Sequence, residues 1–418
     1  MLIRTMQNEL TENGYLRVNV TNESNVPIND ATIDVYYSGE PGRQLEELRT
    51  DVSGMSELIS LAAPPEAWSL DANNIFQPYS EYTIVVNAPG YETQDISGIE
   101  ILANTDSEQN VRLRLSEPGE RGNNIVIPAH TLYGDYPPKI PEASIKQMDT
   151  SGEIVLSRVV VPEIIVVHDG APSDSSALDY YVNYGDYIKN VASSEIYATW
   201  PKSTITANVL AIMSFTLNRV YTEWYRNKGY DFTITSSTAY DHKWIYGRNI
   251  FDEISEVVDD VLDQYISKPN VKQPILTQYC DGVRTSCPEW MSQWGSKSLG
   301  DRGYTPIEIL RYYYGETTYI NTAEQIAGIP SSWPGYNLQN GSQGEKVRQV
   351  QAQIDRIAQV YSAIPRITAD GIYGPRTEEA VRRFQDIFGL PETGIIDRRT
   401  WYKISQIYVG ITGIAELV

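Results

Sequence analysis

The chain has 418 residues, enough for roughly two to four domains with hydrophobic cores. Its 41% hydrophobic and 11% aromatic residues are typical of a folded protein, and no stretch approaches the roughly 18 to 20 apolar residues of a membrane span. The net charge of −21 comes without the basic stripe that phosphate contacts need. Composition therefore argues against nucleic acid and membranes as partners.

The first part of the chain predicts a small β-sandwich, which we place at residues 1–115. Apolar and polar residues alternate over several short segments, with Gly, Pro and Asn between them. These segments are 15–20, 31–37, 82–88 and 111–115. The phrases PINDATI from Pro27 and APGY from Ala88 resemble the carboxypeptidase-regulatory-like sandwich, which implies a module without chemistry of its own.

Charge separates this first module from the rest of the chain. Residues 1–120 contain 6 Arg, no Lys and 20 Asp or Glu, so that 6 − 20 gives a net charge of −14. The following segment, 116–124, combines turn formers and charges, which predicts an exposed linker that proteases can cut. Beyond it we expect an α+β catalytic body at residues 125–325.

One glutamate stands out in this body. Tyr187, Ile188, Val191 and Ala192 lie on one face at helical spacing, and Glu195 follows Val191 by four residues. Glu195 should therefore point inward. Burial makes a carboxylate costly to ionise, so its pKa should rise toward the range that suits a general acid and base.

A second helix is expected directly afterwards. Pro201 suits a first helical position, and apolar residues then recur at helical spacing as far as Trp224. This arrangement leaves Glu195 at a helix end beside aromatic residues. The alternative is that Glu195 merely caps the helix or forms a salt bridge between the two helices.

The run YIKNVASSEIYATWP, residues 187–201, resembles the start of the SpoIID/LytB family of peptidoglycan-cleaving proteins. A second block, MSQWGSK at 291–297 followed by GYTPIEILRYYYG at 303–315, resembles the closing signature of that family. The resemblance implies that Glu195 is the catalytic acid. It also implies a set of substrate-binding residues: Tyr187, Lys189, Ser194, Tyr197, Trp200, Gln278, Met291, Ser292, Gln293 and Trp294.

The chain departs from the family in two places. Ser214-Phe215-Thr216 stands where an Arg-Thr-Tyr phrase is usual, and Cys287 to Trp290 stands where a Gly-His-Gly phrase usually precedes Met-Ser-Gln. We predict no metal and no cofactor, because His130, His168 and His242 lack a metal-type spacing. Cys280 and Cys287 remain open to three interpretations: two buried thiols, a local disulfide, or a structural metal site with His242.

The C-terminal part, residues 338–410, resembles the three-helix peptidoglycan-binding domain. The phrase DGIYGPRT at 370–377 carries the likeness, and it is echoed by TGIIDRRT at 393–400. We expect a Thr near the N-cap of each helix that follows. The resemblance implies wall-binding residues at Asp370, Tyr373, Arg376 and Trp401.

The fold class predicted is thus multidomain α+β, with an N-terminal β-sandwich, a central SpoIID-like domain and a C-terminal three-helix domain. This order resembles the spore cortex-lytic enzymes of anaerobic spore formers. That likeness implies a zymogen at the spore cortex peptidoglycan, activated by a subtilisin-like protease during germination.

The chemistry that fits is a lytic transglycosylase, which needs one carboxylic acid. An ordinary glycosidase needs a second carboxylate, and no Asp or Glu occurs between Glu195 and Glu223. The resemblance leaves open an accompanying amidase activity. The alternative hypothesis is a non-catalytic peptidoglycan-binding scaffold or amidase enhancer.

Overall fold

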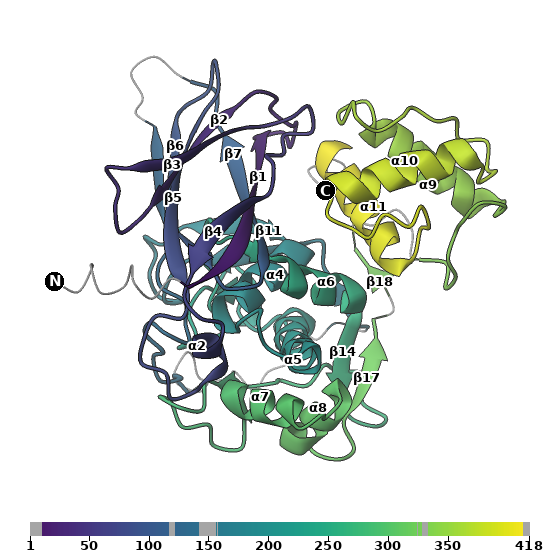
Figure 1. The fold of residues 1–418 in the computed structure, drawn as a ribbon. Helices are drawn as coiled ribbons and strands as arrows, with labels where there is room; N and C mark the ends of the chain where they lie inside the picture. The colour runs from purple at the N-terminus through teal and green to yellow at the C-terminus, as the bar shows by residue number, and fades with distance from the viewer. Residues whose placement is uncertain are drawn as a thin grey trace.

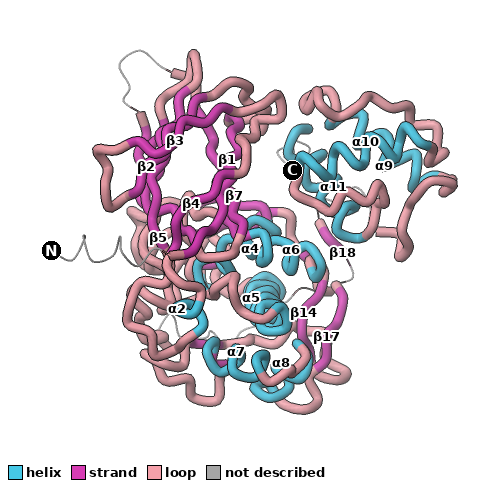
Figure 2. The backbone as a smooth tube through the Cα atoms, in the orientation of Figure 1, coloured by secondary structure: helices cyan, strands magenta, loops and turns pink. Residues whose placement is uncertain are grey.

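The computed structural model of the protein describes residues 11–116, 122–141, 156, 158–323, 325–327 and 333–412. Figure 1 shows three parts, namely a β-module, a central body and a C-terminal helical module. Figure 2 shows that strands dominate the first part and helices the last. In the described ranges, every helix is too short or too polar to cross a bilayer.

The β-module consists of two sheets around one hydrophobic core. One sheet has the strand order β13-β7-β1-β4 and the other β3-β2-β5-β6-β8. On β1, the buried Leu16, Val18 and Val20 alternate with more exposed residues, because successive side chains of a strand point to opposite faces. The strands of this module are β1 (Glu12–Asn22), β2 (Thr32–Tyr37), β3 (Gln44–Arg49), β4 (Ile59–Ala63), β5 (Ser80–Asn87), β6 (Gln94–Ile101), β7 (Asp106–Leu113) and β8 (Asn123–Val126).

The boundary of this module differs from the prediction. We placed its end at residue 115 and a linker at 116–124, but β8 pairs in parallel with β6 over Gln94–Ser97. The module therefore continues to Val126, and residues 123 and 124 belong to a strand. Residues 117–121 of the expected linker lie outside the described residues.

The central body also contributes to the β-module. Its strand β13 (Ile250–Phe251) pairs antiparallel with β7 and forms the edge of the first sheet. In the opposite direction, the short helix α2 (Ala67–Leu70) of the β-module reaches down to the central body (Figure 1). The two parts are therefore joined by backbone pairing as well as by side chains.

Helix α5 (Lys202–Tyr221) is the core of the central body, and Figure 1 shows it encircled by other helices. Every residue from Ala207 to Arg219 is buried, as expected for a helix covered on all sides. We expected Pro201 at the first helical position and an end at Trp224. Pro201 is instead the N-cap, and the helix ends three residues earlier, at Tyr221.

The remaining elements of the central body surround α5. Its small sheets pair β10 with both β11 and β12, β14 with β17, β15 with β16, and β18 with β9. The strands are β9 (Val160–Val161), β10 (Ile164–His168), β11 (Asp179–Asn183), β12 (Ile234–Thr235), β14 (Gln264–Ser267), β15 (Tyr279–Cys280), β16 (Met291–Ser292), β17 (Tyr319–Thr322) and β18 (Gln325–Ile326). The helices are α4 (Tyr184–Glu195), η2 (Arg226–Lys228), α6 (Asp252–Val261), α7 (Gln293–Asp301) and α8 (Pro306–Tyr314).

The C-terminal module contains α9 (Glu345–Ile357), α10 (Pro375–Ile387) and α11 (Arg398–Thr412). Three helices were expected here and three are present in the described part of the module. A threonine was expected near the N-cap of α10, and Thr377 lies in the first turn, three residues after the N-cap Gly374. Thr377 is buried and accepts a hydrogen bond from Gln351 at 3.0 Å.

Candidate active site

Glu195 is the last residue of α4, and its side chain is fully buried at 0% exposure. Asn183 is the N-cap of the helix, and its side chain accepts a hydrogen bond from the Gly185 N–H at 3.1 Å. It ends at Glu195 because Ile196 adopts an extended conformation. The inward direction predicted from the helical spacing is confirmed.

Two donors hold the carboxylate of Glu195. The backbone N–H of Lys243 donates to Oε1 at 2.5 Å, and the Gln293 side-chain amide donates to Oε2 at 3.3 Å. Gln293 is the first residue of α7, and Ser292 caps that helix by accepting from the Gly295 N–H at 2.9 Å. The carboxylate is thus fixed by the α7 N-terminus and by the loop that precedes β13.

Burial raises the pKa of Glu195 to about 7, and loss of hydration is the largest cause. The Lys243 N–H, the Tyr279 hydroxyl and the positive charges of Lys139 and Lys243 act in the opposite direction. The result is a carboxyl group that exists in both protonation states near neutral pH. Such a group can donate a proton and take one back.

Tyr279 lies beside Glu195, and His242 packs on Tyr279. Their rings stack with centroids 5.7 Å apart, and the Tyr187 hydroxyl lies 3.0 Å from His242 Nδ1. Burial lowers the pKa of His242 well below its usual range, so its ring is neutral. Lys243 could not be found from the sequence because it acts through its backbone N–H, whereas Tyr279 lies next to the predicted Gln278.

Three of the predicted aromatic residues gather in one cluster. The Trp294 ring lies 6.2 Å from Tyr197 and 5.0 Å from Trp200, measured between centroids. Trp294 is half-buried, whereas Tyr197 and Trp200 are buried. Trp200 Nε1 donates to the Ser69 carbonyl of the β-module at 3.0 Å, so this cluster lies where the two parts meet.

Other predicted substrate-binding residues have structural partners. Lys189 is buried, and its ammonium group forms an ion pair with Asp259 of α6 at 2.8 Å. The Gln278 carbonyl accepts from the Tyr314 hydroxyl at 3.0 Å. Tyr187, Ser194 and Met291 are fully buried. Among the described residues of the predicted set, Gln293 is the one that donates a hydrogen bond to Glu195, which makes it a positioning residue.

Cys280 and Cys287 form a disulfide that closes the loop between β15 and β16. This bridge rules out the alternatives of two free thiols and of a metal site with His242. Asp281, inside the loop, is fully buried and accepts hydrogen bonds from the backbone N–H groups of Arg284 and Thr285. The loop is therefore fixed from both ends and from its centre.

The four predicted wall-binding residues of the C-terminal module differ in how deeply they are buried. Tyr373 and Trp401 are buried at 1% and 0% exposure, so they stabilise the module and are unavailable to a ligand. Asp370 is exposed but fixes a turn, because it accepts from Gln351 and from the Ile372 N–H. Arg376 is exposed at the start of α10.

Comparison with known proteins identifies the C-terminal module. Residues 343–404 match the family model described as a putative peptidoglycan binding domain. A segment of 76 residues is 41% identical to the zinc D-Ala-D-Ala carboxypeptidase of Streptomyces albus G, over 18% of this chain and 28% of that protein. The chain therefore spans less than a third of this relative. These similarities show that the C-terminal module resembles peptidoglycan-binding domains.

Solved structures give more distant likenesses. The SleB N-terminal domain is 27% identical and matches over 18% of this chain and 99% of that one, with a TM-score of 0.17. The TIE protein of Bacillus anthracis is 12% identical over 25% of this chain and 17% of that one, with a TM-score of 0.18.

Proposed function

We propose that this protein is a spore cortex-lytic enzyme of the SleC type, and that its reaction is lytic transglycosylation of cortex peptidoglycan. The observation that carries the proposal is Glu195, a buried carboxyl group with a pKa of about 7 that two donors hold in place. A general acid works best when its pKa lies near the working pH. The likeness of the C-terminal module to peptidoglycan-binding domains supplies the class of substrate.

The surroundings of Glu195 favour a mechanism with one carboxylic acid. Asp241 is committed to Arg219 at 2.9 Å and to the Tyr225 hydroxyl at 2.6 Å. Asp281 is committed to Arg284 and to the backbone of its own loop. Neither carboxylate is available as the nucleophile or base that a conventional glycosidase requires.

In the reaction we propose, Glu195 protonates the oxygen of the glycosidic bond, and the bond to the anomeric carbon breaks. The C6 hydroxyl of the same sugar then attacks the anomeric carbon and gives its proton to Glu195. The product is a 1,6-anhydro sugar, and Glu195 ends in the protonation state in which it began. No water and no cofactor are consumed.

We further propose that the full-length chain is a zymogen that a subtilisin-like protease activates during germination. The acidic N-terminal β-module and the expected linker at 116–124 support this view. The module has no catalytic cluster of its own among its described residues. Its negative charge would also oppose premature contact with an anionic wall.

Incubation of protease-activated protein with purified cortex fragments tests the reaction. Mass spectrometry should detect anhydromuramic acid ends that appear with time and are missing with Glu195→Gln. Reducing ends without anhydro products would instead indicate a conventional glycosidase. Released stem peptides would reveal an accompanying amidase activity.

A second candidate function is that of a non-catalytic scaffold or amidase enhancer. The complete burial of Glu195 is the observation that favours it, because a buried acid cannot meet a glycan. The two candidates differ after activation. A scaffold would release no product from cortex fragments but would still sediment with insoluble peptidoglycan.

A further inference from the structure

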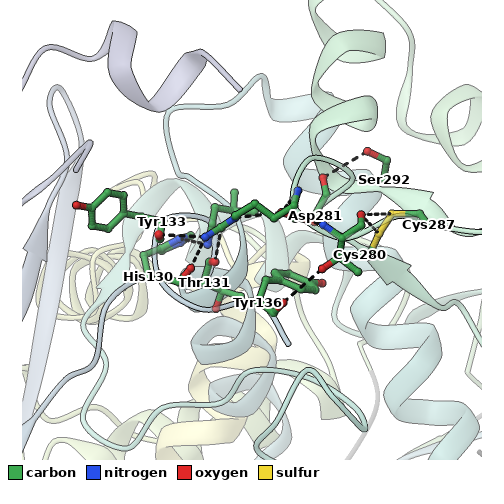
Figure 3. A network of polar contacts seen from close by, with 12 residues as sticks. His130, Thr131, Tyr133, Tyr136, Cys280, Asp281, Cys287 and Ser292 are labelled. Atoms are coloured by element: carbon green, nitrogen blue, oxygen red, sulfur yellow. Dashed lines mark hydrogen bonds and ion pairs between the residues drawn. A yellow bond between two sulfur atoms is a disulfide. The ribbon is translucent and has the colours of Figure 1, made fainter. Parts of the chain in front are cut away.

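One segment between the β-module and the central body lies over the site of Glu195. We call residues 127–141 the strap. Its backbone is held by the loop that contains the disulfide: Arg284 donates to the carbonyls of Thr131 at 2.7 Å and of Tyr133 at 3.0 Å, and also to the Gly134 carbonyl. Thr285 adds a hydrogen bond to the Tyr136 carbonyl at 3.3 Å. Figure 3 shows this network.

The loop that holds the strap is rigid. Asp281 is fully buried, accepts from the Arg284 side chain at 3.3 Å and from two backbone N–H groups, and is flanked by the disulfide between Cys280 and Cys287. A guanidinium group fixed in this way presents its N–H groups in one direction. The strap therefore binds to a loop whose hydrogen-bond donors are already fixed in position.

Some of the strap's other hydrogen bonds tie it to Tyr79 and Ser97 of the β-module and to Arg248, and others reach the neighbours of Glu195. The Thr131 N–H donates to the carbonyl of Ser194, the residue directly before Glu195, at 3.1 Å. Lys139 Nζ donates to the Asp241 carbonyl at 2.6 Å, and the Ile140 N–H donates to the Ala239 carbonyl at 2.7 Å. Asp241 lies two residues before Lys243, whose N–H binds Glu195.

The strap places the side chain of Tyr136 near Glu195. Its side chain is buried, and its hydroxyl has no hydrogen-bond partner among the described residues. Burial raises the pKa of Tyr136 well above its usual range, and the negative charge of Glu195 adds to this shift. Burying a hydroxyl without a hydrogen-bond partner costs free energy. The hydrogen bonds of the neighbouring strap residues must therefore keep the Tyr136 side chain in place.

We propose that the strap occupies the glycan-binding surface beside Glu195, so that the surface beneath it, including Arg284, receives a peptidoglycan strand once the strap has moved. This inference rests on the proposed function for the identity of the ligand. The donors of Arg284 now bind strap carbonyls, and the acyl oxygens of a muramoyl peptide offer the same kind of acceptor.

The strap also changes what activation requires. It is C-terminal to the expected linker at 116–124, so a cut in that linker leaves the strap joined to the central body. Such a cut alone should not uncover Glu195. Activation requires displacement of the strap, whether or not the β-module dissociates.

Thiol labelling of Glu195→Cys tests access to the site without relying on catalysis. Both natural cysteines are in the disulfide, so the introduced thiol is the only free one. In the intact chain it should react slowly with a small maleimide. Adding Tyr136→Ala should raise the rate by about tenfold or more, because the strap would open more often.

Two matched variants control this experiment. Tyr133→Ala removes the same type of side chain from the same strap, but its ring packs on Tyr79 of the β-module and points away from Tyr136 (Figure 3), so labelling should stay slow. Tyr136→Phe keeps the ring and should also stay closed. A cut within 116–124 should leave the rate unchanged, and soluble cortex fragments should slow labelling of the Tyr136→Ala form.

The outcomes separate the inference from the proposed function. Fast labelling of the intact chain, or equal rates for Tyr133→Ala and Tyr136→Ala, would overturn the strap as a cover. A linker cut that matches Tyr136→Ala would assign the cover to the β-module instead. If labelling rises as expected but the uncovered Glu195 form produces no anhydro ends from cortex, the strap stands and the transglycosylase proposal fails.

Discussion

Ionising the buried Glu195 costs free energy. This cost affects both the catalytic chemistry of the residue and the stability of the protein. The side chain is fully buried, and the donors around it offset only part of the lost hydration. Gln293 Nε2 binds one carboxylate oxygen, while Gln293 Oε1 has no partner among the described residues. A glutamine at position 195 would therefore find both a donor and an acceptor.

The substitution Glu195→Gln should abolish glycan cleavage, because it removes the transferable proton and little else. We expect a loss of about 10²-fold or more, the usual contribution of general acid–base catalysis. Quantification of anhydro ends from cortex fragments measures it. Glu316→Gln, at an exposed residue of the same body, is the matched control and should keep full activity. Retention of more than a few per cent of activity by Glu195→Gln would show that another group is the acid.

The raised pKa predicts how activity depends on pH. Glu195 must be protonated to act as an acid, so activity should fall as pH rises through its pKa, which is about 7 while the site stays buried. An acid with an ordinary pKa would already be inactive at neutral pH. A pH–rate profile of the activated enzyme on soluble fragments measures this limb. If activity were already lost with a midpoint below about pH 5, the assignment of Glu195 as the acid would be contradicted.

The free energy of unfolding should also depend on the protonation of Glu195, and the direction of this pH dependence can be predicted. The folded pKa of Glu195 lies above the ordinary value, so the folded state binds the proton more tightly and stability falls as pH rises from about 4.5 to about 7. Glu195→Gln removes this dependence. Its free energy of unfolding should exceed that of the natural protein by ~1–3 kcal/mol above neutral pH and converge with it in acid. Denaturant unfolding at several pH values measures the difference, which should not shrink as pH rises.

At the scale of elements, the C-terminal module contains one motif twice. Gln351 accepts from the Gly371 N–H at 2.8 Å and donates to Asp370, to the Ile372 carbonyl and to Thr377. Gln385 repeats this pattern: it accepts from the Gly394 N–H at 2.8 Å and donates to Thr393, to the Ile395 carbonyl and to Thr400. Each buried glutamine ties a glycine turn to the helix that follows. The echo noticed in the sequence is therefore a repeated hydrogen-bond network.

Gln351→Ala and Gln385→Ala should each destabilise this module by a similar amount. Each change leaves a buried glycine N–H and other groups without a partner, which costs ~1–3 kcal/mol. Thermal unfolding of the full chain measures the effect, together with sedimentation on insoluble peptidoglycan. Gln343→Ala, at an exposed position, is the control. Unchanged melting of both buried variants would refute a structural role for the repeat.

At the scale of the whole molecule, the β-module is docked firmly on the central body. Glu100 and Arg248 form an ion pair at 2.6 Å, and both side chains are buried. Asn249 exchanges two hydrogen bonds with the backbone of Glu100, and Gln109 donates to the Gly247 carbonyl at 3.0 Å. Together with the β13–β7 pairing, these contacts span several elements on both sides.

A cut at 116–124 should therefore leave the β-module bound. The two fragments should co-elute in gel filtration, because the interface keeps all of its contacts. Arg248→Ala should weaken the complex, since it leaves Glu100 buried without its partner. Burial raises the pKa of Glu100 to about 7, so the weakening should be greater at pH about 8 than at about 6, where Glu100 can be neutral. Spontaneous separation of the natural fragments would show that the β-module is a leaving propeptide.

Removal of the chain from Leu338 onward tests the C-terminal module. The truncated protein should bind insoluble peptidoglycan less well but still turn over soluble fragments. The truncation also exposes Asp260 and Asp263 of the central body, which now pair with Arg399 and Arg398. Arg399→Ala in the full chain controls for this loss. Undiminished sedimentation of the truncated protein would contradict a binding role for the module.

Much of the fold and part of the candidate site could be predicted from the sequence. The inward direction of Glu195 follows from its spacing to Val191, and the helical C-terminal module from its repeated phrases. Lys189 shows the limit of such patterns, because helical spacing cannot reveal that Asp259 of α6 lies opposite. Tyr373 and Trp401 show another, since a motif does not say which of its aromatic residues form the core.

The sequence by itself determined features that depend on neighbours along the chain: the α4 face that ends in Glu195, parts of the strands β1, β2, β5 and β7, and the glycine turns of the repeat. Tertiary structure alone decided what surrounds Glu195. Lys243 and Gln293 bind it from 48 and 98 residues away, and the strap reaches it through Arg284, more than 140 residues from Tyr136. The physical reason is that a local pattern fixes which way a side chain points, whereas the packing of distant segments fixes what it meets and whether water or substrate reaches it.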